Sequence, residues 1–217
     1  MRDDDSEEAI LATVEKWYEA FASSPDFAQL SEDHQRKAGA ITQFFAQYAF
    51  NYLEVVPRGW RPSDVIECCT EILPQKVSAE INFFEAMAPV LSAFFEFLRN
   101  QSLLPQGRAL AQAVAGAHNR IVTAAKDRRN WGPAKSFVMA AHEAGVDIQD
   151  EKALQQFLVQ FKLQRMARTG SATPDASRPA SAGSWPGKPA FKPPANRYDP
   201  CPCGSGKKYK FCCEQRG

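Results

Sequence analysis

The sequence predicts an all-α protein in three parts: a bundle of about six or seven helices over residues 1–168, a disordered proline-rich linker over residues 169–196, and a small zinc-binding module over residues 197–217. Three observations lead to this prediction. Apolar residues recur at helical spacing from residue 6 to residue 168, with little strand-like alternation. The composition changes abruptly after Arg168. Four of the six cysteines lie between residues 201 and 213.

Two apolar stripes and one strongly apolar segment predict the first half of the bundle. The stripes are typical of amphipathic helices that face a core. They consist of Ile10, Val14, Trp17 and Phe21, and then of Ile41, Phe44, Phe45, Tyr48 and Tyr52. The segment 78–99 is apolar more than halfway round a helix, so we expect it at the centre of the bundle.

Prolines, glycines and one aspartate set the helix boundaries in the second half. One helix opens near Ser63, after the stretch PRGWRPSD, and another begins after Leu104. Pro133 and Gly145 mark the start and the end of the next helix, because proline is favoured early and glycine late. Asp150 can cap a last helix, whose predicted buried face is Leu154, Phe157, Leu158 and Phe161.

The predicted linker, residues 169–196, holds six prolines and few large apolar side chains. Such a segment buries too little surface to offset the entropy of ordering, so we expect it to be disordered and extended.

Charged residues are distributed unevenly along the chain. Residues 1–167 carry 17 Lys and Arg against 22 Asp and Glu, whereas residues 168–217 carry 9 against 3, which predicts a mildly acidic body with a basic tail.

The N-terminal stretch predicts the cellular compartment. Its sequence, MRDDDSEEAI, is acidic where a secretory signal peptide would be basic, and no uninterrupted run of eighteen apolar residues occurs. We therefore expect a soluble, cytoplasmic protein without a membrane partner. Because thiols stay reduced in the cytosol, clustered cysteines there indicate metal ligands or redox groups rather than disulfides.

The tail offers four thiolates, which satisfy one tetrahedral ion: Cys201, Cys203, Cys212 and Cys213. We expect one ion per chain, zinc first, with iron as the alternative. A fragment of this size has almost no core, so metal binding must supply most of its folding free energy, on the order of 10 kcal/mol. The −2 charge of such a site would be offset by Arg197, Lys207, Lys208 and Lys210.

The stretch DPCPCGSGKKYKFCC, residues 199–213, resembles the SEC-C motif, a small metal-binding module found at the C-terminus of the translocase ATPase SecA and of other bacterial proteins. The arrangement of a helical body, a proline-rich linker and a terminal SEC-C motif is similar to the YecA family. The resemblance implies a zinc module used for docking, with ribosomes or chaperones such as SecB as partners. The residues expected to contact a partner are Lys207, Lys208, Tyr209, Lys210 and Phe211.

These features favour a non-enzymatic adaptor that docks through its tail. Two alternatives stay open: an enzyme or sensor with an unrecognised site in the helical body, and direct RNA binding by the basic tail, where lysines lie beside aromatic rings. No small-molecule substrate is evident, because phosphate-binding, nucleophile and dinucleotide motifs are missing.

Three other candidate sites are better explained structurally. Cys68 and Cys69 fit a buried helical face. His142 and Glu143 lack the second histidine that a zinc protease helix requires. The cations in AAKDRRNW, with Trp131 beside them, fit a solvated helix end better than a phosphate site.

Overall fold

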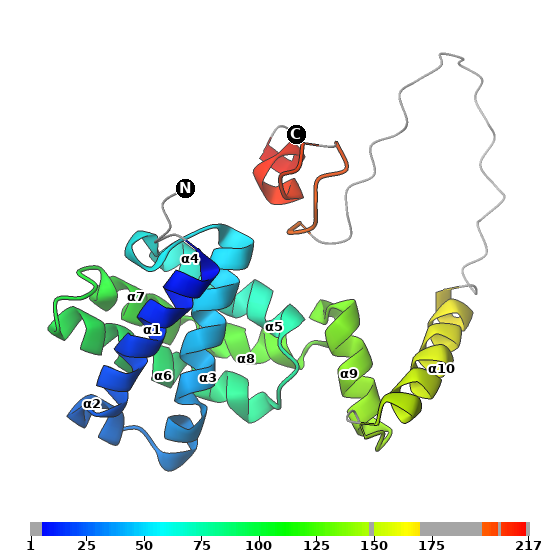
Figure 1. Cartoon of the computed structure of the whole chain (residues 1–217), viewed down its shortest axis with the longest axis horizontal. Coiled ribbons are helices and arrows are strands. Elements are labelled where there is room, and N and C mark those ends of the chain that lie inside the picture. The colour runs from blue at the N-terminus through cyan, green and yellow to red at the C-terminus, as the bar shows by residue number, and fades with distance from the viewer. Residues whose placement is uncertain (1–5, 148–149, 170–196, 204, 216–217) are drawn as a thin grey trace. The chain divides into compact units, whose positions relative to one another are not determined.

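The computed structural model describes residues 6–147, 150–169, 197–203 and 205–215 of the chain. It divides into two compact units, Met1–Met166 and Ala167–Gly217. Figure 1 follows the chain from its N-terminus through the first unit, hereafter the helical unit. Apart from Thr169, which ends the last helix, the predicted linker lies outside the described residues.

The all-α prediction is confirmed. Within the described residues, seven α-helices have nine or more residues and three are shorter; π-helical turns η2 (Ala49–Leu53) and η4 (Cys68–Ile72) lie between them. The α-helices are α1 (Glu7–Ala22), α2 (Pro25–Ala28), α3 (Glu32–Tyr48), α4 (Pro62–Glu67), α5 (Leu73–Lys76), α6 (Ile81–Asn100), α7 (Gly107–Gly116), α8 (His118–Lys126), α9 (Pro133–Glu143) and α10 (Glu151–Thr169). Six of the long helices, α1, α3, α6, α7, α9 and α10, correspond to predicted ones. The helix predicted near Ser63 is the short α4, and α8 has no separate counterpart in the prediction.

Short polar side chains begin several of these helices. The hydroxyl oxygens of Ser6, Ser24 and Ser31 each accept a hydrogen bond from the backbone N–H three residues later, at 3.2 Å. Asp150 caps α10 as predicted, because its Oδ1 accepts from the N–H groups of Lys152 and Ala153. These bonds satisfy N–H groups that have no partner within the helix.

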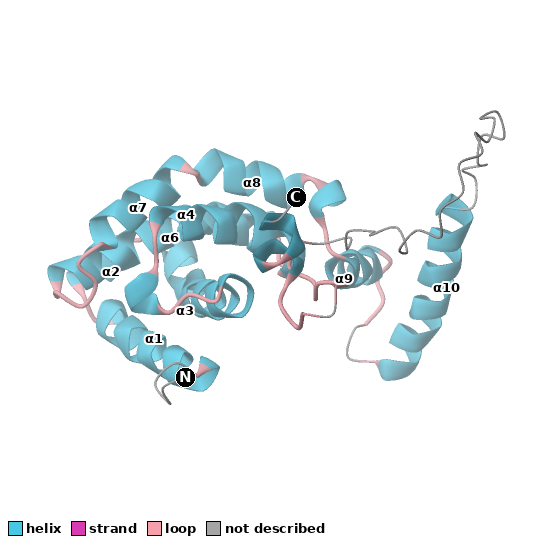
Figure 2. Cartoon of the chain, turned by 90° about the horizontal axis from the view of Figure 1, so that it is seen from above, coloured by secondary structure: helices cyan, strands magenta, loops and turns pink. Residues whose placement is uncertain are grey.

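Helix α6 forms the centre of the helical unit, as its sequence predicts. It packs against α1, α3, α7 and α8 and continues through Pro89. Figure 2 shows it enclosed by neighbouring helices. The Phe95 side chain has no exposed surface, and its ring centroid lies 5.5 Å from that of Phe45 and 6.0 Å from that of Trp60. Edge-on aromatic contacts of this kind add to the stabilisation from apolar burial.

One helix in the described part of the chain, α6, is long and apolar enough to cross a membrane by length and composition. Of its apolar window, 61% is buried inside the helical unit. A core helix passes the same test, and the contacts of α6 with α1, α2, α3, α7 and α8 account for its apolar surface.

The backbone of α7 lies very close to that of α6 at Gly107, the first residue of α7. A Cβ atom at this position would lie 2.3 Å from the carbonyl oxygen of Phe95 and 3.0 Å from Cβ of Arg99. Glycine is therefore required here by the contact between the two backbones.

Candidate metal centre

Within the second unit, residues 199–209 form a tight backbone hairpin. The N–H of Cys201 donates to the carbonyl oxygen of Lys207 at 2.7 Å, and the N–H of Tyr209 donates to that of Asp199 at 2.9 Å. Gly206 turns the chain with φ of +73°, a conformation that L side chains rarely adopt. Gly204, which precedes this turn, lies outside the described residues.

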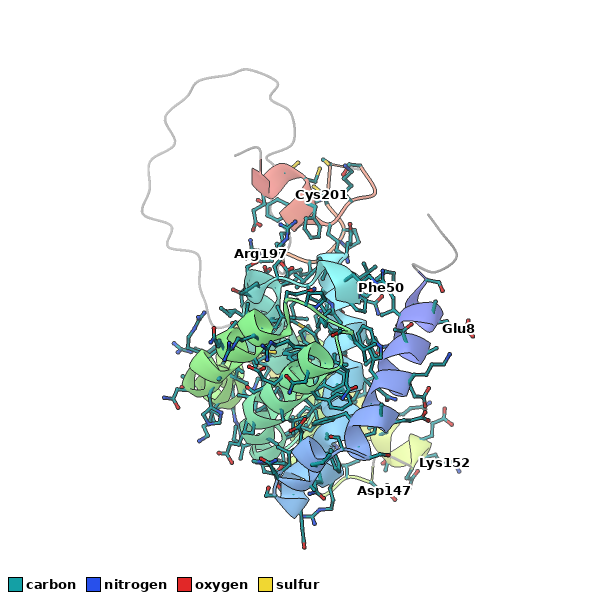
Figure 3. All side chains as sticks on the ribbon, turned by 90° about the vertical axis from the view of Figure 1, so that its left-hand side faces the viewer. Glu8, Phe50, Asp147, Lys152, Arg197 and Cys201 are labelled. Carbon is teal, nitrogen blue, oxygen red and sulfur yellow. The ribbon has the colours of Figure 1, made fainter. Side chains whose placement is uncertain are left out.

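A single helical turn then brings the chain back towards the first two cysteines. Residues Tyr209–Phe211 form a 3₁₀ turn, and the N–H of Cys212 donates to the carbonyl oxygen of Tyr209 at 3.1 Å. The guanidinium of Arg197 pairs with the carboxylate of Glu214 at 2.7 Å and joins the two ends of the module (Figure 3, where Arg197 and Cys201 are labelled).

The four cysteines converge at this point. Their sulfur atoms all lie within 4.8 Å of one another, with 3.4 Å between Cys203 and Cys212 and 4.0 Å between Cys212 and Cys213. Tetrahedral zinc with four thiolates, at Zn–S distances of about 2.3 Å, places the sulfurs roughly 3.8 Å apart. The donor set therefore fits one metal ion of this geometry. Cys201 and Cys212 are buried, and Cys203 is exposed.

Hydrogen bonds within the cluster shift the pKa values of two of its thiols in opposite directions. Bonds from Ser205 and Cys201 lower the pKa of Cys203 to about 6, and the hydrogen bond with Cys201 raises the pKa of Cys213 to about 12. The hydroxyl of Ser205 also lies 3.1 Å from the sulfur of Cys212. A cation bound among the four sulfurs would favour the thiolate form of each.

The comparison with protein families agrees with this geometry. The family model described as the SEC-C motif matches residues 199–215. These residues are a SEC-C motif. The SEC-C motif, with its four-cysteine cluster, makes the module a metal-binding element, whereas the helical unit is not assigned to a family.

Part of the chain is also similar to SecA translocase subunits. It is 43% identical over 68 residues to SecA of Geobacter sp. strain M21, which covers 31% of this chain and 6% of that protein. SecA of Wolinella succinogenes is 35% identical over 78 residues, or 36% of this chain and 8% of that protein. The chain thus spans less than a tenth of these relatives. No solved structure matches it.

The residues expected to bind a partner have unequal exposure on the SEC-C module. Lys207 is exposed, whereas Lys208, Tyr209, Lys210 and Phe211 are half-buried. The ammonium of Lys210 lies 5.4 Å from the ring centroid of the buried Tyr198 and 5.3 Å from that of Phe211. The sequence did not reveal this contact. Arg197, expected to offset the charge of the metal site, also pairs with Glu214.

The buried position predicted for Cys68 and Cys69 is confirmed. Neither side chain has exposed surface, and burial raises the pKa of both thiols. Sulfur in such surroundings stays protonated and unreactive.

The cations near Trp131 pair with acidic residues. Arg128 pairs with Glu143, Arg129 with Asp127, and Lys126 with Glu85. These ion pairs agree with the interpretation of the segment AAKDRRNW as a solvated helix end rather than a phosphate site. His142 is exposed on α9.

An open surface hollow of about 440 Å³ lies beside η4 and α8. Arg120, Asn119 and Thr123 line it together with Glu71, Asn130 and Asp127, among other residues. Hydrogen bonds from Arg129 lower the pKa of Asp127, so this carboxylate is already engaged on the protein surface.

Proposed function

We propose that this protein is a cytoplasmic, non-enzymatic adaptor that docks on an acidic protein surface through a zinc-ordered SEC-C module. The convergence of four cysteine sulfurs within 4.8 Å carries the proposal. Four thiolates complete a tetrahedral ion and leave no position for a reactive water, so the ion would hold the fold rather than activate a nucleophile. Zinc is proposed because it favours tetrahedral thiolate sites, and iron is the alternative.

The contacts of the module favour a protein partner over RNA. Binding of single-stranded RNA relies on aromatic faces that are open for base stacking. Here Tyr198 is buried, and the ammonium of Lys210 lies against the rings of Tyr198 and Phe211. Lys207 is exposed at the hairpin, next to the half-buried Lys208, and its positive charge suits a carboxylate on a partner.

The test is charge reversal at the hairpin. We expect Lys207→Glu combined with Lys208→Glu to weaken binding to purified SecB or to isolated ribosomes by about tenfold or more, with metal content unchanged. Lys152→Glu, at an exposed lysine of α10, serves as the matched control and should bind like the wild type. Undiminished binding by the double variant would move the interaction away from the SEC-C module.

Salt dependence separates the two classes of partner. If ribosomal RNA is bound, the logarithm of affinity should fall by about 0.7 to 0.9 per log unit of salt for each phosphate neutralised. A contact with an acidic protein should give a shallower slope. A steep slope that becomes shallower in the double variant would therefore support RNA and overturn the protein partner proposed here.

A further inference from the structure

Lys135, in the first turn of α9, is buried although it carries a charge. Its side chain is 1% exposed, and its ammonium donates to the carbonyl oxygen of Pro74 at 2.8 Å. The ring centroids of Phe84 and Trp131 lie 4.6 Å and 5.1 Å from the same nitrogen. Among the described residues, no carboxylate lies within ion-pair distance of Lys135. A buried ammonium without a counter-charge is costly.

Few other contacts hold α9 in place. The N–H of Gly132 donates to the carbonyl oxygen of Gln75 at 2.9 Å, so the start of α9 makes two bonds to neighbouring carbonyls of α5. The indole N–H of Trp131 donates to the carbonyl oxygen of Ala125 at 2.9 Å. At the other end of α9, Glu143 pairs with Arg128. Polar contacts therefore attach both ends of α9 to neighbouring elements.

Helix α10 packs on α9 through an aromatic cluster. The ring of Phe137 lies 5.7 Å from that of Phe157 and 5.5 Å from that of Phe161. On another face of α10, Val159 and Leu163 are 60% and 61% exposed. Figure 1 shows α9 and α10 following the other helices of the unit, with α9 next to α5.

We propose that α9 and α10 open as one body from the rest of the helical unit, and that burial of the Lys135 ammonium against Pro74, Phe84 and Trp131 controls this opening. The aromatic cluster keeps the two helices together, while the contact at α5 is the part that breaks. Opening returns the ammonium to water and removes the desolvation free energy that its burial costs.

The pH dependence has a definite sign. Burial lowers the pKa of Lys135 from 10.5 to about 8, so the docked state binds fewer protons than the open state between these values. Docking must then strengthen as the pH rises. The opening equilibrium constant should fall about tenfold between pH 7 and pH 9.

The charged groups around Lys135 do not reverse this sign. They are Lys76 on α5, Glu85 on α6, Lys126 on α8, Arg128 in the turn before α9, and Glu143 on α9 itself. Glu85 pairs with Lys126, Glu143 pairs with Arg128, and the ammonium of Lys76 lies over the ring of Tyr52.

Hydrogen exchange followed by mass spectrometry tests the proposal on the full chain. After correction for intrinsic exchange rates, we expect amides of α9 and α10 to open together, with α9 protected about tenfold more at pH 9 than at pH 7. A local measurement is needed because Cys68 and Cys69 act oppositely on global unfolding: their raised pKa values remove stability as the pH rises through the range where unfolded thiols ionise.

Two lysine variants complete the test. Lys135→Met should make the opening of α9 independent of pH, whereas Lys126→Met, at a lysine whose side chain is 60% exposed, should retain the wild-type profile. Exchange of α9 and α10 at the same rate as α3 and α6 would show that they do not open separately. A wild-type profile without pH dependence, or an unchanged profile in Lys135→Met, would remove Lys135 from the control of opening.

Discussion

Replacing Cys212 and Cys213 together by serine should abolish metal binding and unfold the SEC-C module. Two of the four sulfurs that lie within 4.8 Å of one another are lost, and the hairpin that remains has almost no core of its own. The metal is expected to contribute on the order of 10 kcal/mol to folding of this module. Elemental analysis of the purified protein measures the effect directly, and an unchanged metal content would reject this ligand set.

The other two cysteines provide the matched control. Cys68→Ala combined with Cys69→Ala removes two sulfurs from the core of the helical unit and should leave metal content unchanged. The four-cysteine cluster lies in a unit separate from the helices, so the ligand variant should also keep its helical circular dichroism. A cooperative loss of helical signal on metal removal would show instead that the module stabilises the helical unit.

Gly107→Ala is expected to destabilise the helical unit by about 3 kcal/mol or more. The new methyl group would lie 2.3 Å from the carbonyl oxygen of Phe95, which belongs to the backbone of the central helix and cannot rotate away. Either α7 moves off α6 or α6 bends, and both reduce the packing of the core. Urea unfolding, followed by circular dichroism, measures the change in the free energy of unfolding.

Gly116, at the other end of α7, provides the matched control. Substituting it by alanine tests whether the loss of stability expected for Gly107→Ala comes from the contact with α6 or from replacing any glycine of α7. A Cβ atom there meets nothing within 4 Å. Gly116→Ala should therefore stabilise the protein by roughly 0.5 to 1 kcal/mol, through better helix propensity and a less flexible unfolded chain. Equal effects of the two substitutions would contradict the close approach of α7 to α6.

The sequence predicts the parts of the molecule in which local pattern and packing agree. The apolar surface of α6 extends so far round the helix that it can be satisfied only at the centre of a bundle. The cap at Asp150 follows from its side-chain chemistry. The convergence of the four cysteines follows from their spacing, because a chain this short must turn back within the eight residues that separate the two pairs.

Other features depend on tertiary contacts that leave no local signal. The π-helical turns η2 and η4 interrupt segments whose apolar spacing is that of ordinary helices. Lys135 stands among residues typical of an amphipathic helix, and its burial depends on Pro74 and Phe84, which lie far away in the sequence. The sequence predicts that Lys210 contacts a partner, and it gives no signal of the contact with Tyr198, which exists only after the hairpin forms.

Trp60 gives the protein an optical reporter of its own. The indole is 2% exposed, lies 4.9 Å from the ring of Phe45, and has a buried N–H without a hydrogen-bond partner among the described residues. Its fluorescence should therefore lie at short wavelength and move to the red when the core opens to water. None of the four tryptophans falls within residues 197–217, so indole emission reports on the rest of the chain and not directly on the SEC-C module.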